Sequence, residues 1–313
     1  MSRTCTPLLA IALVVLLPAG SAVASQAIVE EFVSDPTLPN GPHVFVLDGP
    51  GAAQFVHQPD TAPRFLGDPR GSLAVTYDSL LPTSRLVADL RGQLTEQDDF
   101  IFGAVITIRP EGLAADPFGF HPIAFGLLGS ATTGNDRTGD LSDFASDTYD
   151  TVELAYFPNV SPFFGGPFLS PTVFGEPLGP DAFMNFAFGS GSIALEPGRT
   201  YLIEMEHSAL ERTLAARVSE VRPDGRALPV ADGEIAAGLS GITGFLVDNL
   251  GLFAYHDGFN EFAASGRSLL ATVDFDLLFA GALRDGKLPG ELMQALKRFK
   301  RSSRLPVPRE PLE

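Results

Sequence analysis

The chain contains almost no cysteine, since Cys5 is the only one among its 313 residues. Cys5 also lies in an N-terminal segment that we expect to be removed. A mature chain without cysteine excludes disulfide bonds, a cysteine nucleophile and a cysteine-ligated zinc site. Its fold must therefore depend on a hydrophobic core, which a chain of this length with 45% hydrophobic residues is able to form.

Tryptophan is absent, and lysine is missing from residues 25–283, which hold 12 arginines against 34 acidic residues. The resulting charge argues against nucleic acid as a partner, because phosphate binding requires clustered lysine and arginine. Residues 284–313 instead carry eight basic residues and four acidic ones. This contrast predicts a body domain over residues 25–283, followed by a basic tail over residues 284–313.

Long apolar runs are also scarce, and residues 8–17 form the longest. A bilayer span needs roughly 20 apolar residues, so this run is too short to be one. It follows Arg3 and precedes a small-x-small pattern at residues 22–24, the arrangement of a secretory signal peptide. We predict a signal peptide over residues 1–24 and a mature chain without a transmembrane segment, secreted to a bacterial periplasm, cell surface or medium. An uncleaved anchor is the alternative.

Alternation of apolar and polar residues dominates the body and predicts strands. It is clearest in residues 269–279 and 200–207, whereas residues 100–108 are apolar on both faces, as in a central strand covered on both sides. Further strands are expected at 72–77, 85–90, 123–128, 151–157, 183–188, 213–221 and 244–255. About a dozen strands without alternating helices predict an all-β fold of two packed antiparallel sheets.

Turn residues separate the expected strands. The tripeptide at residues 223–225 (PDG) predicts a hairpin between strands at 213–221 and 226–231. Longer connections at residues 110–122, 129–149 and 158–181 are expected to be loops, where a β-sandwich usually binds its ligands.

The basic tail alone shows helical spacing. Leu292, Ala295, Leu296 and Phe299 share one face of a helix expected over residues 288–301. So short a helix is marginal by itself. We expect its apolar face to dock on a sheet while its basic residues face acidic groups of the body; a free tail that contacts an anionic envelope or a partner is the alternative.

Three groups of segments in the body resemble a known superfamily. The first group is 146–153 (SDTYDTVE), 156–159 (YFPN) and 164–167 (FGGP); the second is 195–198 (LEPG) and 200–205 (TYLIEM); the third is 247–251 (VDNLG), 255–258 (YHDG) and 271–274 (ATVD). In order and spacing they resemble the jelly-roll modules of the concanavalin A-like lectin/glucanase superfamily, in particular secreted and surface-sorted bacterial members.

The resemblance covers roughly residues 28–282 and implies a two-sheet antiparallel jelly-roll sandwich. Members of the superfamily include sugar-binding lectins, glycan hydrolases and structural modules. We therefore expect a secreted, non-catalytic β-sandwich of the cell surface or matrix that binds a glycan, calcium or a cell-envelope component. The alternatives are a diverged glycan hydrolase and a structural module that binds a partner.

Two carboxylate pairs are candidates for catalysis: Glu204 with Glu206, and Asp274 with Asp276. Residues two apart on a strand lie roughly 6–7 Å from each other on one face. Such a separation is near that of the acid and base in glycoside hydrolases. The resemblance implies a longer alternating motif of three acids, which the chain lacks. We therefore favour the interpretation that both pairs are polar faces of half-buried strands, and that the protein is not an enzyme.

An acidic loop is the candidate metal site. Asp136, Asp140, Asp143, Asp147 and Asp150 lie close together in the sequence. Calcium prefers six to eight oxygen ligands, many of them from loop aspartates. The spacing lacks the regularity of an EF-hand, so a solvated acidic loop is the competing interpretation.

A second polar set follows an expected strand end: Asp248, Asn249, His256, Asp257 and Asn260. We interpret these residues mainly as turn-forming groups that bond the backbone, with ligand contact as the alternative. The sequence has no histidine spacing typical of a zinc site, no serine-hydrolase elbow and no phosphate-binding glycine loop.

Overall fold

The computed structural model describes residues 27–39, 41–49, 51–59, 71–78, 81, 84–110, 123–130, 150–157, 168–176, 185–189, 191, 193, 195–254 and 270–301. The predicted signal peptide and most of the acidic loop lie outside these ranges. Within them, no helix has the length and apolar character needed to cross a bilayer.

The larger sheet, sheet A, has nine strands in the order β16-β13-β12-β11-β6-β15-β4-β3, with β1 also paired to β15. These strands are β1 (Ile28–Glu30), β3 (Phe55–Gln58), β4 (Ser72–Asp78), β6 (Phe100–Ile108), β11 (Thr200–Ser208), β12 (Thr213–Val221), β13 (Arg226–Gly238), β15 (Leu270–Ala282) and β16 (Lys300–Arg301). A single turn of 3₁₀ helix, η1 (Ala52–Gln54), precedes β3.

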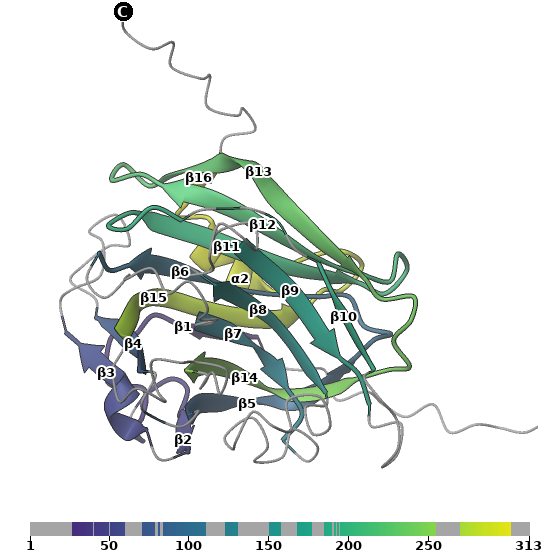
Figure 1. Ribbon diagram of the computed structural model, residues 1–313, viewed down its shortest axis with the longest axis horizontal. Coiled ribbons are helices and arrows are strands. Elements are labelled where there is room, and N and C mark those ends of the chain that lie inside the picture. The colour runs from purple at the N-terminus through teal and green to yellow at the C-terminus, as the bar shows by residue number, and fades with distance from the viewer. Residues whose placement is uncertain are drawn as a thin grey trace, which may run out of the picture.

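The second sheet, sheet B, has seven strands in the order β10-β9-β8-β7-β14-β5-β2. Its strands are β2 (Val46–Asp48), β5 (Ser84–Thr95), β7 (Ile123–Leu128), β8 (Thr151–Phe157), β9 (Phe168–Phe174), β10 (Phe186–Phe188) and β14 (Leu246–Ala254). The chain crosses repeatedly between the two sheets, which face each other as a sandwich (Figure 1). This confirms the predicted all-β, jelly-roll architecture.

The space between the sheets is filled by one large cluster of buried aliphatic and aromatic side chains. Strand β6 contributes Phe102 and Ala104 to this core, while Ile101 and Val105 point to the opposite side of sheet A. Both faces of β6 are therefore buried, as its continuous apolar sequence predicts.

The hairpin between β12 and β13 shows how local sequence sets the register. Gly225 adopts φ +77°, a conformation that glycine reaches without steric cost. The Asp224 carboxylate accepts the backbone N–H of Arg226 at 3.1 Å. Turn chemistry at this tripeptide therefore fixes the start of β13, which confirms the predicted hairpin.

The basic tail docks on the outer face of sheet A, on the side away from sheet B (Figure 1). Leu292, Leu296 and Phe299 are buried there in a cluster with residues of β6, β11 and β15. Arg298 forms an ion pair with Glu31 of the body. The expected docking is thus confirmed, although the helix α2 (Gly290–Leu296) is shorter than the range 288–301.

The expectation of a loop over residues 158–181 is wrong for part of that range, because residues 168–174 form β9. Pro171 lies inside β9, opposite Leu154 of β8. A proline in a strand usually argues against the assignment, since it cannot donate to the ladder. The carbonyl of Pro171 points toward Gly189, directly after the short edge strand β10. The proline nitrogen points the same way, so its missing N–H disrupts no bond to β8.

Candidate functional site

The outer face of sheet B carries a row of polar side chains on β8 and β9. Strand pairing places Gly126 of β7 opposite Glu153 of β8, which lies opposite Thr172 of β9. Thr172 in turn lies opposite Phe188 of the edge strand β10. Because Val152 belongs to the core between the sheets, Glu153 and the residues in its row point outward.

Three phenylalanines form a stack at the β10 edge of this face. The rings of Phe174 and Phe186 are stacked with centroids 6.0 Å apart. Phe186 and Phe188 are stacked at 5.7 Å and nearly parallel, with 10° between their planes. Phe188 ends the stack and is 59% exposed. It presents a flat aromatic surface to solvent on a two-ring support.

Hydroxyl groups line the sheet directly beside this stack. The side-chain oxygens of Ser170 and Thr172 are 3.0 Å apart. Both residues are largely buried, and Glu153 is almost fully buried. These groups make the surface of sheet B next to Phe188 polar. Glu153 has bonding partners of its own, and its burial gives it a supporting role rather than direct contact with a ligand.

The short strand β10 is held in place at both of its ends. Before it, the Asn185 side chain donates to the Glu176 carbonyl at 2.9 Å and bonds the Thr243 hydroxyl. After it, the backbone N–H of Gly189 donates to the Pro171 carbonyl at 2.9 Å. Phe188 is therefore carried by a fixed strand rather than a free edge, which lowers the entropy cost of binding through its ring.

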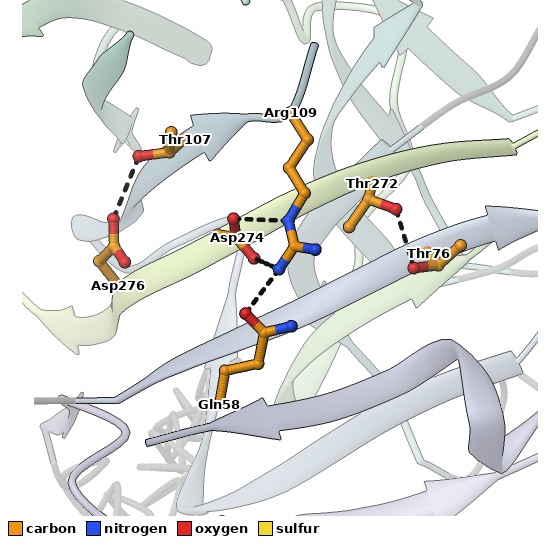
Figure 2. Close-up of polar contacts among 7 residues, drawn as sticks. All are labelled: Gln58, Thr76, Thr107, Arg109, Thr272, Asp274 and Asp276. Atoms are coloured by element: carbon orange, nitrogen blue, oxygen red, sulfur yellow. Dashed lines mark hydrogen bonds and ion pairs between the residues drawn. The ribbon is translucent and has the colours of Figure 1, made fainter. Parts of the chain in front are cut away.

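The predicted pair Asp274 and Asp276 lies on the outer face of sheet A, in a polar cluster shown in Figure 2. Arg109 donates from Nε to Oδ2 of Asp274 at 2.8 Å and from Nη2 to Oδ1 at 2.7 Å. Its Nη2 also donates to the Gln58 side chain at 2.6 Å. Both carboxylate oxygens of Asp274 are thus engaged in a two-pronged ion pair.

Asp276 is the extra residue of a β-bulge, because the pairing of β15 with β6 shifts between Phe275 and Leu277. The bulge turns its carboxyl group toward the Thr107 hydroxyl, which donates to it at 3.3 Å. The pKa of Asp276 is raised to about 8, chiefly by burial and then by the nearby charge of Asp274, against a lowering by the Thr107 hydrogen bond. Asp276 is only 2% exposed, and Arg109 engages both carboxylate oxygens of Asp274.

The other predicted pair, Glu204 and Glu206, lies on β11 on the outer face of sheet A. Glu206 accepts a hydrogen bond from Arg217 of β12 at 2.8 Å. Arg217 lies directly opposite Glu204 in the strand register. The pair therefore surrounds one half-exposed arginine, an arrangement typical of a surface ion-pair network.

Of the predicted calcium ligands, the structure describes Asp150 alone; Asp136, Asp140, Asp143 and Asp147 lie outside the described residues. Asp150 is buried directly before β8 and adopts φ +46°. Its Oδ1 accepts the backbone N–H of Leu246 at 2.8 Å. This bond ties the start of β8 to the start of β14. Among the described residues, no group of three or more acidic, histidine or cysteine side chains is arranged to hold a metal ion.

Asp248 acts as a backbone-bonding group. Its carboxylate accepts the N–H and the hydroxyl of Ser130, each at 2.7 Å, and the side chain of Asn249 at 2.6 Å. It lies at an irregularity of β14, where the pairing with β5 shifts. The turn-forming interpretation of Asp248 agrees with these bonds, whereas His256, Asp257 and Asn260 lie outside the described residues.

Phe188, Thr172, Ser170 and Glu153 are not among the site residues that the sequence predicts. Alternation within residues 151–157 already places Glu153 on the face opposite Val152 and Leu154. The aromatic surface was not accessible to such reasoning, because it needs the pairing of β9 with β10.

The structure of the chain is similar to solved structures of lectins, whereas comparisons of its sequence find no match. No family model matches the chain, and a search of curated proteins finds no match. Lectin II from Ulex europaeus is 12% identical with a TM-score of 0.41, over 83% of this chain and 99% of that one. The carbohydrate recognition domain of Emp47p is 11% identical with a TM-score of 0.46, over 82% and 94%. Lectin I-B4 from Griffonia simplicifolia, in its metal-free form, is 12% identical with a TM-score of 0.41, over 77% and 100%.

These solved structures are lectins of the concanavalin A-like jelly-roll type, the superfamily that the sequence resembles. Identities of 11–12% and TM-scores below 0.5 carry no argument about function. What the chain binds must be argued from its own residues.

Proposed function

We propose that this protein is a non-catalytic β-sandwich that binds a glycan on the outer face of sheet B. The observation that carries the proposal is the exposed ring of Phe188, stacked on Phe186 and set beside the hydroxyls of Thr172 and Ser170. A sugar ring offers an apolar face of C–H groups and an edge of hydroxyl groups. The exposed ring of Phe188 complements the apolar face, and the largely buried hydroxyls of Thr172 and Ser170 make its surroundings polar.

The absence of tryptophan gives phenylalanine this role in the chain. Phenylalanine has no polar atom, so its exposure to water costs free energy without a compensating hydrogen bond. An exposed phenylalanine on a rigid support is therefore typical of a contact surface. Stacking on one ring contributes about 0.5–1.5 kcal/mol beyond the buried area, which predicts weak binding of single sugars and a preference for longer chains.

A glycan array tests the proposal directly. The full mature chain is expected to bind a restricted set of oligosaccharides, with little response to single sugars. Binding to no glycan at protein concentrations of about 1 mM would contradict it, because even one such contact with hydrogen bonds should reach a Kd of that order.

Secretion and a place at the cell surface or in the matrix belong to the same proposal. They are supported by the signal-peptide pattern of residues 1–24 and the absence of cysteine after Cys5. N-terminal sequencing of the exported protein should begin at Ser25. An exported chain that still begins at Met1 would contradict the cleavage.

Calcium binding in the acidic loop of residues 136–150 is the remaining component of the proposal, supported by the five aspartates of that loop. Calcium at a hundredfold excess over its Kd should stabilise the fold by about 2.7 kcal/mol. The substitutions Asp140→Asn and Asp143→Asn together should abolish the increase in melting temperature. An unchanged melting temperature of the wild type in millimolar calcium would instead support a solvated loop.

A further inference from the structure

A small pocket opens on the inner face of sheet A, and none of the residues that line it belongs to β9 or β10. Its volume is about 180 Å³, and it lies between the ends of β11, β12 and β13 and the turn at residues 196–199. Tyr201, Glu220 and Leu228 share one row of the strand register and form its floor. This pocket is separate from the proposed glycan site.

Two arginines line the pocket, and they differ in their bonding. Arg199 forms ion pairs with Glu196 at 2.6 Å and with Glu220 at 2.9 Å. Both acidic groups are thus directed to Arg199. Arg222 makes no side-chain hydrogen bond or ion pair with any described residue, and its Nε is buried without an acceptor.

An unsatisfied charged donor is unfavourable, because removing it from water costs free energy that no protein acceptor returns. The planar guanidinium of arginine matches a carboxylate, which accepts from two nitrogens at once. A carboxylate bound beside Arg222 would supply acceptors for its guanidinium group.

A second donor is available on the same floor. The hydroxyl oxygen of Tyr201 accepts the backbone N–H of Glu196 at 2.8 Å. This bond uses an acceptor position of the phenol and leaves its own proton free to be donated. Burial raises the pKa of Tyr201, so the hydroxyl keeps that proton at neutral pH.

The opposite wall is apolar and is formed by an irregular stretch of β13. Arg217 pairs with Glu234 and Ser219 pairs with Pro229, so four residues, 230–233, oppose a single residue of β12. Asp232 within this bulge adopts φ +53°, which is uncommon for a residue with a side chain. Bulges re-aim side chains and are frequent next to binding sites. Here the bulge places Val230 and Ala231 against the pocket.

We propose that this pocket binds a small monocarboxylate, with the carboxylate on Arg222 and the Tyr201 hydroxyl and the carbon skeleton on Leu228 and Val230. A phosphate monoester carries up to two negative charges and would meet the repulsion of Glu196 and Glu220. A single carboxylate requires less compensation. The apolar wall also favours a ligand with a hydrocarbon part over an inorganic anion.

Isothermal titration of the full mature chain with butyrate and benzoate tests the proposal, with butyramide and inorganic phosphate as comparison probes. At least one of the two carboxylates should bind, whereas butyramide and phosphate should bind at least tenfold more weakly. Arg222→Gln should weaken carboxylate binding at least tenfold. Arg284→Gln, which changes an exposed arginine outside the pocket, should leave it unchanged.

Ala231→Trp provides a variant that keeps both arginines. Residue 231 is exposed at the pocket, so a large side chain is expected to fill the space without disturbing the core. It should abolish carboxylate binding at an unchanged melting temperature. Binding of neither carboxylate by the wild type, equal binding of butyramide or phosphate, or carboxylate binding that survives both Arg222→Gln and Ala231→Trp would overturn the proposal. None of these results bears on the glycan site, which glycan titration measures separately.

Discussion

Arg109, which directly follows β6, holds Asp274 of β15 through two hydrogen bonds, from Nε at 2.8 Å and from Nη2 at 2.7 Å. The backbone N–H of Arg109 also donates to the Thr272 carbonyl of β15. Side chain and backbone therefore fix the end of β6 against β15 together. A carboxylate held in this way has a structural role.

Replacing Arg109 tests that role. Arg109→Leu removes the ion pair and leaves the Asp274 carboxylate, which is 17% exposed, without its main partner. We expect the free energy of unfolding to fall by about 1–3 kcal/mol, measured by urea denaturation. Arg284→Leu, at an exposed position, is the control and should change it by less than about 0.5 kcal/mol. Equal effects of the two variants would show that the ion pair contributes nothing specific.

Asp276 should make stability depend on pH. The folded chain retains its proton up to a pKa of about 8, whereas an unfolded aspartate releases it near its ordinary value of 3.8. Unfolding then releases a proton between these values, so the free energy of unfolding should fall as pH rises from about 4 to 8. Burial raises the pKa of Glu30 to about 7, which acts in the same direction.

Asp276→Asn supplies the matching measurement. The amide resembles the protonated carboxyl group, so the variant should have nearly wild-type stability at about pH 4. At about pH 9 it should be more stable than the wild type by on the order of 1–4 kcal/mol, since one pKa unit corresponds to about 1.4 kcal/mol. Urea unfolding at both pH values checks this. If the difference in the free energy of unfolding between wild type and variant does not vary with pH, Asp276 does not titrate in this range.

The docked tail should contribute to the stability of the body. Leu292 is fully buried on sheet A, whereas its neighbour Met293 is 41% exposed. Leu292→Ala is expected to lower the free energy of unfolding by about 2–4 kcal/mol, and Met293→Ala by less than about 1 kcal/mol. Denaturant unfolding of both variants distinguishes docking from a loosely held tail, for which the two substitutions would have similar, small effects.

The hydrogen bonds of Asn185, which hold the start of β10, should affect glycan binding although Asn185 is not part of the aromatic stack. Asn185→Ala removes the side-chain bonds to Glu176 and Thr243 before the strand. We expect glycan affinity to fall about three- to tenfold, because Phe188 would have to be ordered on binding. Ser208→Ala, at the end of β11 in sheet A, serves as the control for titration. An affinity that Asn185→Ala leaves unchanged would show that β10 needs no such support.

Much of the architecture was accessible from the sequence, because strand periodicity and turn chemistry are local signals. The alternation in residues 200–207 predicted β11, and the tripeptide at 223–225 predicted the β12–β13 hairpin. Strand β9 was not predicted. It contains Pro171, and a proline usually argues against a strand because it cannot donate to the ladder. The strand is possible here because the proline nitrogen faces the side of the short edge strand β10, which the sequence does not reveal.

The site was less accessible, since it depends on contacts between segments distant in sequence. Spacing alone suggested that Asp274 and Asp276 share one open face, but the bulge at Asp276 buries that carboxyl group. Conversely, no local pattern shows that Phe188 ends a three-ring stack, because Phe174 belongs to the neighbouring strand. Sequence periodicity predicts which side chains of one strand share a face, whereas contacts between strands depend on the register of their pairing.

The most direct test of the central claim is a titration of the best oligosaccharide from the array against Phe188→Ala and Phe188→Tyr. Leu210→Ala serves as the control, because Leu210 is 93% exposed in the turn between β11 and β12 and belongs to neither β9 nor β10. We predict that Phe188→Ala weakens binding about tenfold or more, a loss of about 1.4 kcal/mol, while Phe188→Tyr and Leu210→Ala retain it. An affinity unchanged in Phe188→Ala would contradict glycan binding on this face of sheet B.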